Sequence, residues 1–203
     1  AGIAAAPDGV YHGHAAIDDD GTSDQPVHIH CTITIKGDEL EVDFEGTDAQ
    51  VATNINCPFA SCLASALSCV KSVISAPDIP FNEGVKRPVT VKAPFGSILN
   101  PRPPAPVRAR LLPAYRAYNA VMDALAKAVP AQVIAPGYDT TTSFCLAHLG
   151  EKGYSVYLEI FGGGYGAGAG NDGVDAVDSP LSNCSNTPVE SLDADYDFFR
   201  VTG

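Results

Sequence analysis

The sequence predicts an α+β protein, in which mixed antiparallel sheets pack with two main amphipathic helices. Three observations support this fold class. Segments with an apolar period of two, typical of strands, occur both before and after the middle of the chain. Two segments between them have apolar residues at intervals of three and four, which indicates amphipathic helices. The regular strand–helix alternation of a doubly wound parallel sheet is absent from the pattern.

The first clear strand is VHIHCTITIK, residues 27–36. Its odd-numbered residues are apolar and mostly β-branched, whereas its even-numbered residues are polar. One face of this strand is therefore expected to be buried and the other to face solvent. Gly37 and Asp38 form a turn, and ELEVDF at 39–44 continues the alternation. Together the two segments predict a β-hairpin.

Two helices are predicted from the change of period. Residues 58–74 form the first, and residues 113–128, bracketed by Pro113 and Pro130, form the second. Residues 75–107 between them are rich in proline and glycine, which excludes long helices there. The run RPVTVKAP within that stretch suits a short strand.

Two further strands, TTTSFCLAHL and YSVYLEIF, are predicted on either side of the turn GEKG. They lead into the glycine-rich stretch EIFGGGYGAGAGNDG, residues 159–173. Alanine stands where a dinucleotide fingerprint needs its last glycine, and the Gly-Lys-Ser/Thr ending of a P-loop is missing. A nest of backbone N–H groups there could still bind an anion. The favoured interpretation is a tight backbone crossing that glycine alone can follow.

The composition argues against several classes of protein, namely nucleic-acid-binding, membrane-bound and zinc-module proteins. The chain has 203 residues, 45% of them hydrophobic, which is enough for a packed core. A net charge of −12 argues against nucleic acid or an anionic membrane as a partner. No apolar run approaches the roughly 18 residues of a membrane span. The six cysteines match no zinc module, so we expect reduced, buried thiols and a cytoplasmic location.

Four of the five histidines form two pairs, His12 with His14 and His28 with His30. His28 and His30 would share one face of a strand and could both bind a metal. That face is also the polar one, and a pair lacks the third and fourth ligands of a zinc site. We therefore predict no metal site here. The aspartates at 18–20 lack the spacing of a calcium loop and are expected to form a solvated turn.

Two polar groupings are candidates for a site. Asp43 ends a predicted strand and is closely followed by Thr47, and strand ends are rigid positions on which sites are built. The alternative is an ordinary outward-facing polar position. Arg108 and Arg110 could hold a carboxylate or phosphate, or could pair with internal carboxylates.

The motifs taken together resemble one family. They are GVYHGHAAIDDDG, VDFEGTDAQV, PDIPFNEGVKRPVTVKAPFGSILNPRPPAPVRAR, DALAKAVP, EIFGGGYGAGAGNDGVDA and NCSNTPVESL. In this combination and order they resemble the hydantoinase B/oxoprolinase family, which includes the beta subunit of ATP-dependent N-methylhydantoinases, the matching part of 5-oxoprolinase, and lactamase and acetone carboxylase relatives. The resemblance implies that residues 1–203 are the central part of such a domain, a segment of a larger subunit whose N- and C-terminal portions are absent.

The resemblance also implies that two subunits carry out different steps of the reaction. A partner ATPase of the hydantoinase A type binds ATP and phosphorylates the carbonyl of a small cyclic amide. The present chain then helps water to open a hydantoin, oxoproline or lactam ring. The alternatives are a subunit of an ATP-dependent ketone carboxylase and a non-catalytic assembly domain. Any divalent metal of the family is expected in the absent N-terminal portion, and the four paired histidines do not match its ligands.

Two sets of residues are candidates for this chemistry. Carboxylates could act as general bases that position the attacking water: Asp43, Asp139, Glu159 and Asp172. Other residues could bind the substrate or an anionic intermediate: Thr47, Arg108, Arg110, Gly163, Gly164, Asn183 and Asn186.

Overall fold

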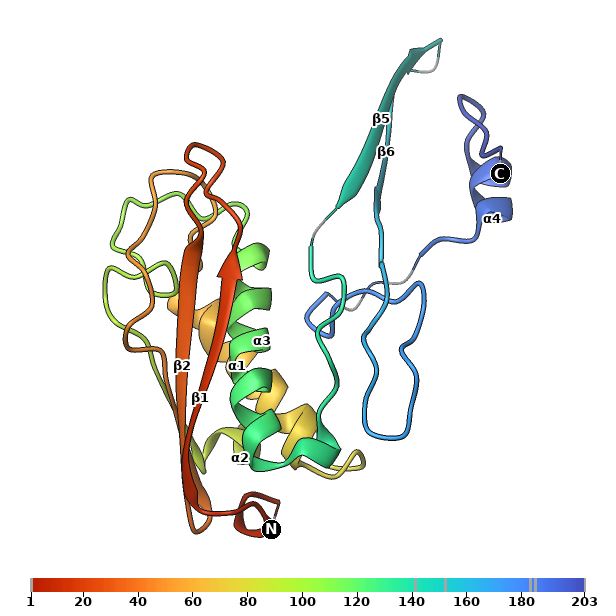
Figure 1. Ribbon diagram of the computed structural model, residues 1–203. Helices are drawn as coiled ribbons and strands as arrows, with labels where there is room; N and C mark the ends of the chain where they lie inside the picture. Colours follow the sequence, from red (N-terminus) through yellow and green to blue (C-terminus); the bar gives the residue numbers. More distant parts are fainter. Residues whose placement is uncertain (1, 141, 152, 183, 185, 203) are drawn as a thin grey trace.

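A computed structural model describes residues 2–140, 142–151, 153–182, 184 and 186–202. Its main body is a four-stranded sheet packed with two long helices (Figure 1). The strands are β1 (Gly9–Ile17), β2 (Val27–Lys36), β3 (Glu39–Asp43) and β4 (Val89–Lys92), and they lie side by side in that order. The predicted α+β class is confirmed. The first three strands are antiparallel, whereas β4 runs parallel to β3, which the sequence pattern did not predict.

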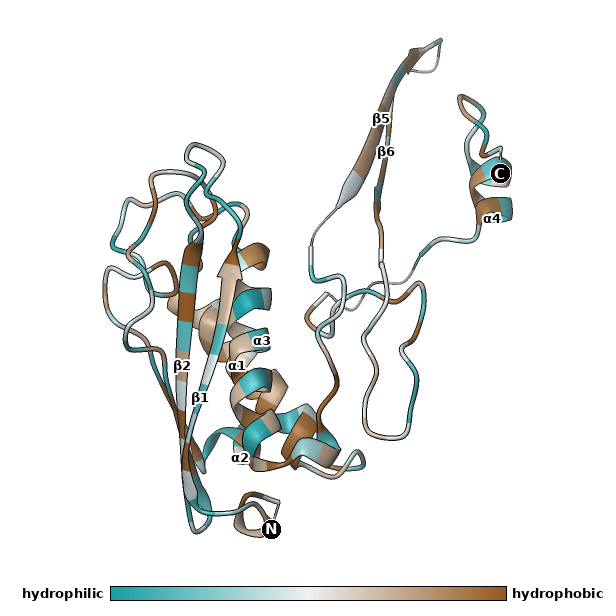
Figure 2. Ribbon diagram, in the orientation of Figure 1, coloured by the Kyte–Doolittle hydropathy of each residue, from teal (hydrophilic) through white to brown (hydrophobic). Residues whose placement is uncertain are grey.

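The predicted hairpin is formed by β2 and β3. Ile29 and Ile33 on the odd face of β2 are fully buried, while His30 on the even face is exposed. Figure 2 shows this alternation as hydrophobic and hydrophilic bands along β2. Gly37 lies in the turn with a φ of 61°, a left-handed conformation that favours glycine. The prediction of a half-buried strand is thus confirmed.

Both predicted helices are present as α1 (Phe59–Ile74) and α3 (Leu111–Ala128). Helix α3 begins two residues before the predicted start, so Pro113 lies in its first turn, where backbone N–H groups have no partner within the helix. Helix α3 packs on β1 and β2, and α1 packs beside α3. Small residues, Ala117, Ala120 and Ala124, are fully buried at this contact and allow a close approach of helix and sheet.

Strand β1 was not predicted, because GVYHGHAAI is rich in small residues and shows no apolar alternation. It pairs with β2 over its whole length, from Gly9 opposite Ile35 to Ile17 opposite Val27. The loop that follows is the expected solvated turn. In it, Asp20 Oδ1 accepts hydrogen bonds from the backbone N–H groups of Thr22 and Ser23.

The stretch 75–107 contains no long helix, as predicted, and RPVTVKAP supplies β4. It also contains one helical turn, α2 (Glu83–Lys86). Asn82 caps its N-terminus, and the Asn82 side chain accepts a hydrogen bond from the Gly84 N–H. Two short 3₁₀ turns complete the main body, at Ile3–Ala5 and Pro130–Gln132.

The predicted second pair of strands forms a separate antiparallel hairpin of β5 (Ser143–Gly150) and β6 (Gly153–Ile160), visible as a long projection in Figure 1. Thr141 of the predicted strand and Lys152 of the predicted turn lie outside the described residues. One hairpin face packs with the C-terminal segment, where Tyr157 contacts Tyr196 and Phe199, and helix α4 (Val189–Asp195) belongs to that segment. Leu149, Val156 and Leu158 of the hairpin are exposed.

All six cysteines are free thiols. Four are buried as expected: Cys31, Cys57, Cys62 and Cys69. The expectation is wrong for Cys145 and Cys184, which are exposed because the hairpin and the C-terminal loop that carry them lie outside the main core. Among the described residues, no helix has the length and apolar character needed to cross a membrane.

Candidate functional site

The glycine-rich segment forms the middle of an irregular three-stranded ribbon. On one side, Ala135 N–H donates to Ala167 O at 2.9 Å and Tyr138 N–H donates to Gly164 O at 3.0 Å. On the other side, Gly164 N–H donates to Val177 O at 2.9 Å. The segments around 135–138 and 174–178, which are far apart in sequence, are therefore joined through the glycines.

Glycine is required at this crossing by close packing. A Cβ on Gly163 would lie 2.3 Å from the Tyr138 ring, and a Cβ on Gly162 would lie 2.5 Å from the backbone nitrogen of Asp178. The N–H groups of Gly162, Gly164 and Gly168 already donate to protein oxygens. These N–H groups are therefore not available to an anion, and the prediction of a tight structural crossing is confirmed.

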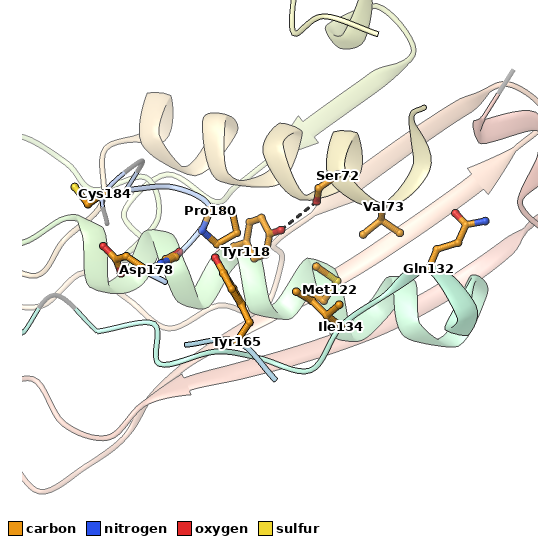
Figure 3. Close-up of a pocket in the computed structure, with 11 residues that line it drawn as sticks. Ser72, Val73, Tyr118, Met122, Gln132, Ile134, Tyr165, Asp178, Pro180 and Cys184 are labelled. Atoms are coloured by element: carbon orange, nitrogen blue, oxygen red, sulfur yellow. Dashed lines mark hydrogen bonds between the residues drawn. The ribbon is translucent and has the colours of Figure 1, made fainter. Parts of the chain in front are cut away.

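A cavity of about 520 Å³ opens where this ribbon meets the two long helices. Helix α1 contributes Ser72, helix α3 contributes Tyr118 and Met122, and the ribbon contributes Tyr165 and Asp178 (Figure 3). Hydrophobic and polar side chains thus meet in one concave space, as in sites for small molecules.

The hydroxyl groups of the cavity are placed to act as neutral hydrogen-bonding groups. Ser72 Oγ and the Tyr118 hydroxyl lie 3.1 Å apart. Burial raises the pKa of Tyr118 to about 12. Burial also raises the pKa of Tyr165, and the carboxylate of Asp139 raises it further. Both tyrosines are therefore protonated at neutral pH and can donate a hydrogen bond.

Asp178 is the carboxylate of the cavity. It is only 6% exposed, and its Oδ1 accepts a hydrogen bond of 2.7 Å from the Ser179 N–H. Its Oδ2 is buried and has no hydrogen-bond partner among the described residues. A buried carboxylate oxygen without a partner costs free energy, so this atom is a natural acceptor for a bound group that carries an N–H or O–H.

Asp139 lies next to the cavity and is held firmly. Its Oδ2 accepts hydrogen bonds of 3.1 Å from Asn119 Nδ2 and from the Gly137 N–H. Arg116 donates to its backbone oxygen at 3.2 Å, and its φ is 42°. Asp139 is thus brought close to the crossing and to Gly164, which accepts from the neighbouring residue Tyr138.

Glu159 and Asn186 form a second cluster, between β6 and the C-terminal segment. The Glu159 carboxylate accepts hydrogen bonds from the Tyr157 hydroxyl and from both the N–H and the hydroxyl of Thr187. Burial raises the pKa of Glu159, but these three hydrogen bonds outweigh burial, so the pKa is lowered from its usual value. Asn186 forms two hydrogen bonds with the backbone of Gly162. Both side chains therefore hold the C-terminal segment against the start of the crossing.

The remaining predicted residues do not join the cavity. Asp43 Oδ1 accepts from the Glu45 N–H at 3.0 Å, and Thr47 exchanges hydrogen bonds with the backbone of His30. Asp172 is exposed in a loop. The roles predicted for these residues stay predictions.

The two arginines before α3, Arg108 and Arg110, are also exposed. Neither forms a salt bridge within the part of the chain that the structure describes. Pairing with internal carboxylates, one of the two alternatives for them, is therefore not observed there. Asn183 lies outside the described residues.

Sequence patterns do not reveal four of the residues that line the cavity: Ser72, Tyr118, Tyr165 and Asp178. Asp178 lies in an aspartate-rich stretch that is typical of turns, Tyr118 lies on a helix face that resembles ordinary core, and Ser72 is a polar helix residue outside the apolar stripe. Only the serine–proline pair after Asp178, which favours a turn, offers a weak local signal.

Comparison with known proteins identifies the family. Residues 1–201 match the family model described as Hydantoinase B/oxoprolinase. The chain belongs to the hydantoinase B/oxoprolinase family. It is 34% identical over 200 residues to the B-type subunit of a putative D-/L-hydantoinase from a Pseudomonas species, a match that covers 94% of this chain. It is 31% identical over 179 residues to 5-oxoprolinase 1 of Arabidopsis thaliana, a match that covers 88% of this chain.

Solved structures show the same fold. An ATP-dependent caprolactamase from Pseudomonas jessenii superimposes with a TM-score of 0.82 at 26% identity over 96% of this chain. A nucleotide-free acetone carboxylase superimposes over 95% of this chain with a TM-score of 0.77 at 17% identity, which shows the fold alone. The chain spans 34% of the length of the hydantoinase relative and of the caprolactamase chain, 29% of the acetone carboxylase chain, and 13% of 5-oxoprolinase 1.

Proposed function

We propose that this chain is a segment of the beta subunit of an ATP-dependent cyclic amidohydrolase, which opens a hydantoin, oxoproline or lactam ring. ATP is bound by a partner ATPase of the hydantoinase A type, which phosphorylates the ring carbonyl. The observation that carries the proposal is the family match along residues 1–201, together with relatives named as a hydantoinase and a 5-oxoprolinase. The likeness to an ATP-dependent caprolactamase supports the use of ATP.

Ring opening requires activation because an amide carbonyl is a poor electrophile. Conversion of the carbonyl oxygen to a phosphate ester makes the ring carbon more electrophilic. Water then attacks this carbon, the ring C–N bond breaks as the nitrogen takes up a proton, and a second water hydrolyses the resulting acyl phosphate to a carboxylate and phosphate. A carboxylate that accepts the proton of this water acts as a general base and contributes about 10²–10⁴-fold to the rate.

The cavity beside the glycine crossing suits such a substrate. Its volume of about 520 Å³ falls within the range of roughly 300–1,000 Å³ typical of small-molecule sites. Tyr118 and Tyr165 supply donors for a carbonyl or phosphate oxygen, and Asp178 supplies an acceptor for a ring N–H or for the attacking water. We assign the general base to Asp178, with Asp139 as the second candidate because it lies beside Tyr118 and Tyr165 of the cavity.

The test is co-expression of the full-length protein that contains this chain with its candidate ATPase partner. Phosphate release and ring-opened product are measured together for hydantoins, 5-oxoproline and lactams, with and without bicarbonate. Ring opening that is coupled to phosphate release and independent of bicarbonate supports the proposal. Phosphate release that requires bicarbonate and a ketone identifies a carboxylase instead. A complex without either reaction identifies a non-catalytic assembly domain.

A further inference from the structure

Three histidine side chains converge on the polar face of the sheet, outside the cavity and its proposed reaction. His14 of β1 lies directly opposite His30 of β2 in the strand register, and His28 lies two residues from His30 on the same face. The neighbouring His12 turns to Thr32 instead, with Nδ1 3.1 Å from the threonine hydroxyl. Pairing of β1 with β2 thus adds the imidazole of His14 to the His28 and His30 pair on β2.

The separations of these rings resemble those around a tetrahedral metal ion. His14 Nε2 lies 3.1 Å from His28 Nδ1. The ring centroids are 5.2 Å apart for His14 and His28, and 5.0 Å apart for His14 and His30. A zinc–nitrogen bond of about 2.1 Å places two tetrahedral imidazole centroids at about 5.2 Å from each other. Two of the three pairs therefore match this geometry.

The third pair is wider. The centroids of His28 and His30 are 6.3 Å apart, and no three such side chains in the described residues are already arranged around one point. His14 and His30 are exposed, so a change of side-chain rotamer can close the triangle without moving the sheet. The backbone under them is fixed, because His14 N–H donates to Asp123 Oδ2 and His28 N–H donates to Asp48 Oδ2.

The imidazole nitrogens of the three histidines and the negative charge of the chain favour binding of a cation. A neutral imidazole nitrogen is the form that binds a metal. The chain carries a net charge of −12, which attracts cations to its surface. Imidazole nitrogens suit zinc and its neighbours in the transition series rather than magnesium or calcium.

We propose that His14, His28 and His30 bind one divalent transition-metal ion, preferably zinc, on the outer face of the sheet, with water in the fourth position. Three protein ligands and one open position is an arrangement that zinc adopts in proteins. The site is independent of the cavity and of the proposed ring opening, and it was not expected from the sequence because β1 was not predicted.

The experiment uses untagged, metal-free protein titrated with Co²⁺ at pH 7.5, followed by visible absorption, and with Zn²⁺, followed by calorimetry. We expect one ion per chain and a Co²⁺ spectrum typical of tetrahedral coordination. His14→Gln, His28→Gln and His30→Gln should each weaken binding at least about tenfold, since even partners that only orient a ligand are worth that much. Binding should weaken as the pH is lowered, because protons compete with the metal ion for the imidazole nitrogens.

His12→Gln is the matched control, since it lies on the same strand face but bonds to Thr32. It should leave the affinity unchanged, and circular dichroism checks that all four variants are folded. The proposal is overturned if no ion binds stoichiometrically, if His30→Gln binds as tightly as the unmodified chain, or if His12→Gln weakens binding as much as His14→Gln.

Discussion

Replacement of Gly13 by alanine tests how closely β1 packs on α3. This packing holds α3, which carries Tyr118 and Met122 of the cavity, against the sheet. A Cβ at position 13 would lie 1.9 Å from the backbone oxygen of Ala120 and 2.7 Å from the backbone nitrogen of Ala124. Strand and helix would have to separate by about 1.5 Å to restore ordinary contact, which begins at 3.4 Å. Both atoms belong to the helix backbone, so no side-chain rotation can relieve the contact.

Overpacking of this kind costs about 1–3 kcal/mol, and the rigid backbone contact puts Gly13→Ala near the upper value. For a domain of this size about 1 kcal/mol corresponds to a change in Tm of roughly 2–4 °C, so we expect a decrease of about 6–12 °C. The assay is thermal unfolding followed by circular dichroism. Gly37→Asn is the control, because Gly37 has open space around it and asparagine tolerates its left-handed φ. Equal melting temperatures for Gly13→Ala and the unmodified chain would refute the close contact of β1 with α3.

Two further predictions concern ionisable groups. Because the pKa of Glu159 is lowered on folding, its stabilising contribution is present above the unfolded pKa of about 4.3 and is lost as the pH falls through the folded value. Glu159→Gln should therefore lower Tm at pH 7, and this deficit should shrink as the pH falls below about 4.3. The exposed Glu151→Gln should have little effect at any of these pH values. A Glu159→Gln deficit that does not shrink with falling pH would contradict this linkage. A thiol reagent should modify two cysteines of the native chain rapidly, Cys145 and Cys184, and the other four only after unfolding, since burial raises the pKa of Cys31 and Cys57 to about 12. Rapid modification of more than two thiols would show that the core opens.

Periodicity was sufficient to predict the elements whose apolar residues face one core. The alternation in β2 and the three-and-four spacing in α1 and α3 reflect burial on one side, which the structure confirms. Strand β1 lacks this apolar periodicity for a physical reason. Its inward position Gly13 must be small to admit the α3 backbone, so the residue with the closest contact carries no apolar side chain. The histidine cluster depends on that same strand and was therefore also hidden.

The cavity could not be predicted from local patterns, because its residues come from separate parts of the chain. Ser72 looks like an ordinary polar helix residue, Tyr118 looks like a core residue, and Asp178 looks like a turn residue. The glycine crossing joins these parts, and its structural role was predictable because its spacing fits neither nucleotide motif. Local sequence patterns do not predict that the backbone of Asp178 packs directly against Gly162.

Ring opening by the assembled complex that carries Asp178→Asn measures most directly whether the cavity is the reaction site. Product formation and phosphate release are followed for the preferred cyclic amide, and thermal unfolding confirms that the variant is folded. The rate of ring opening should fall about 10²–10⁴-fold, the usual contribution of a general base. The exposed Asp175→Asn, three residues away, should retain full activity. A folded Asp178→Asn complex that opens the ring at the unmodified rate would contradict the assignment of this cavity as the reaction site.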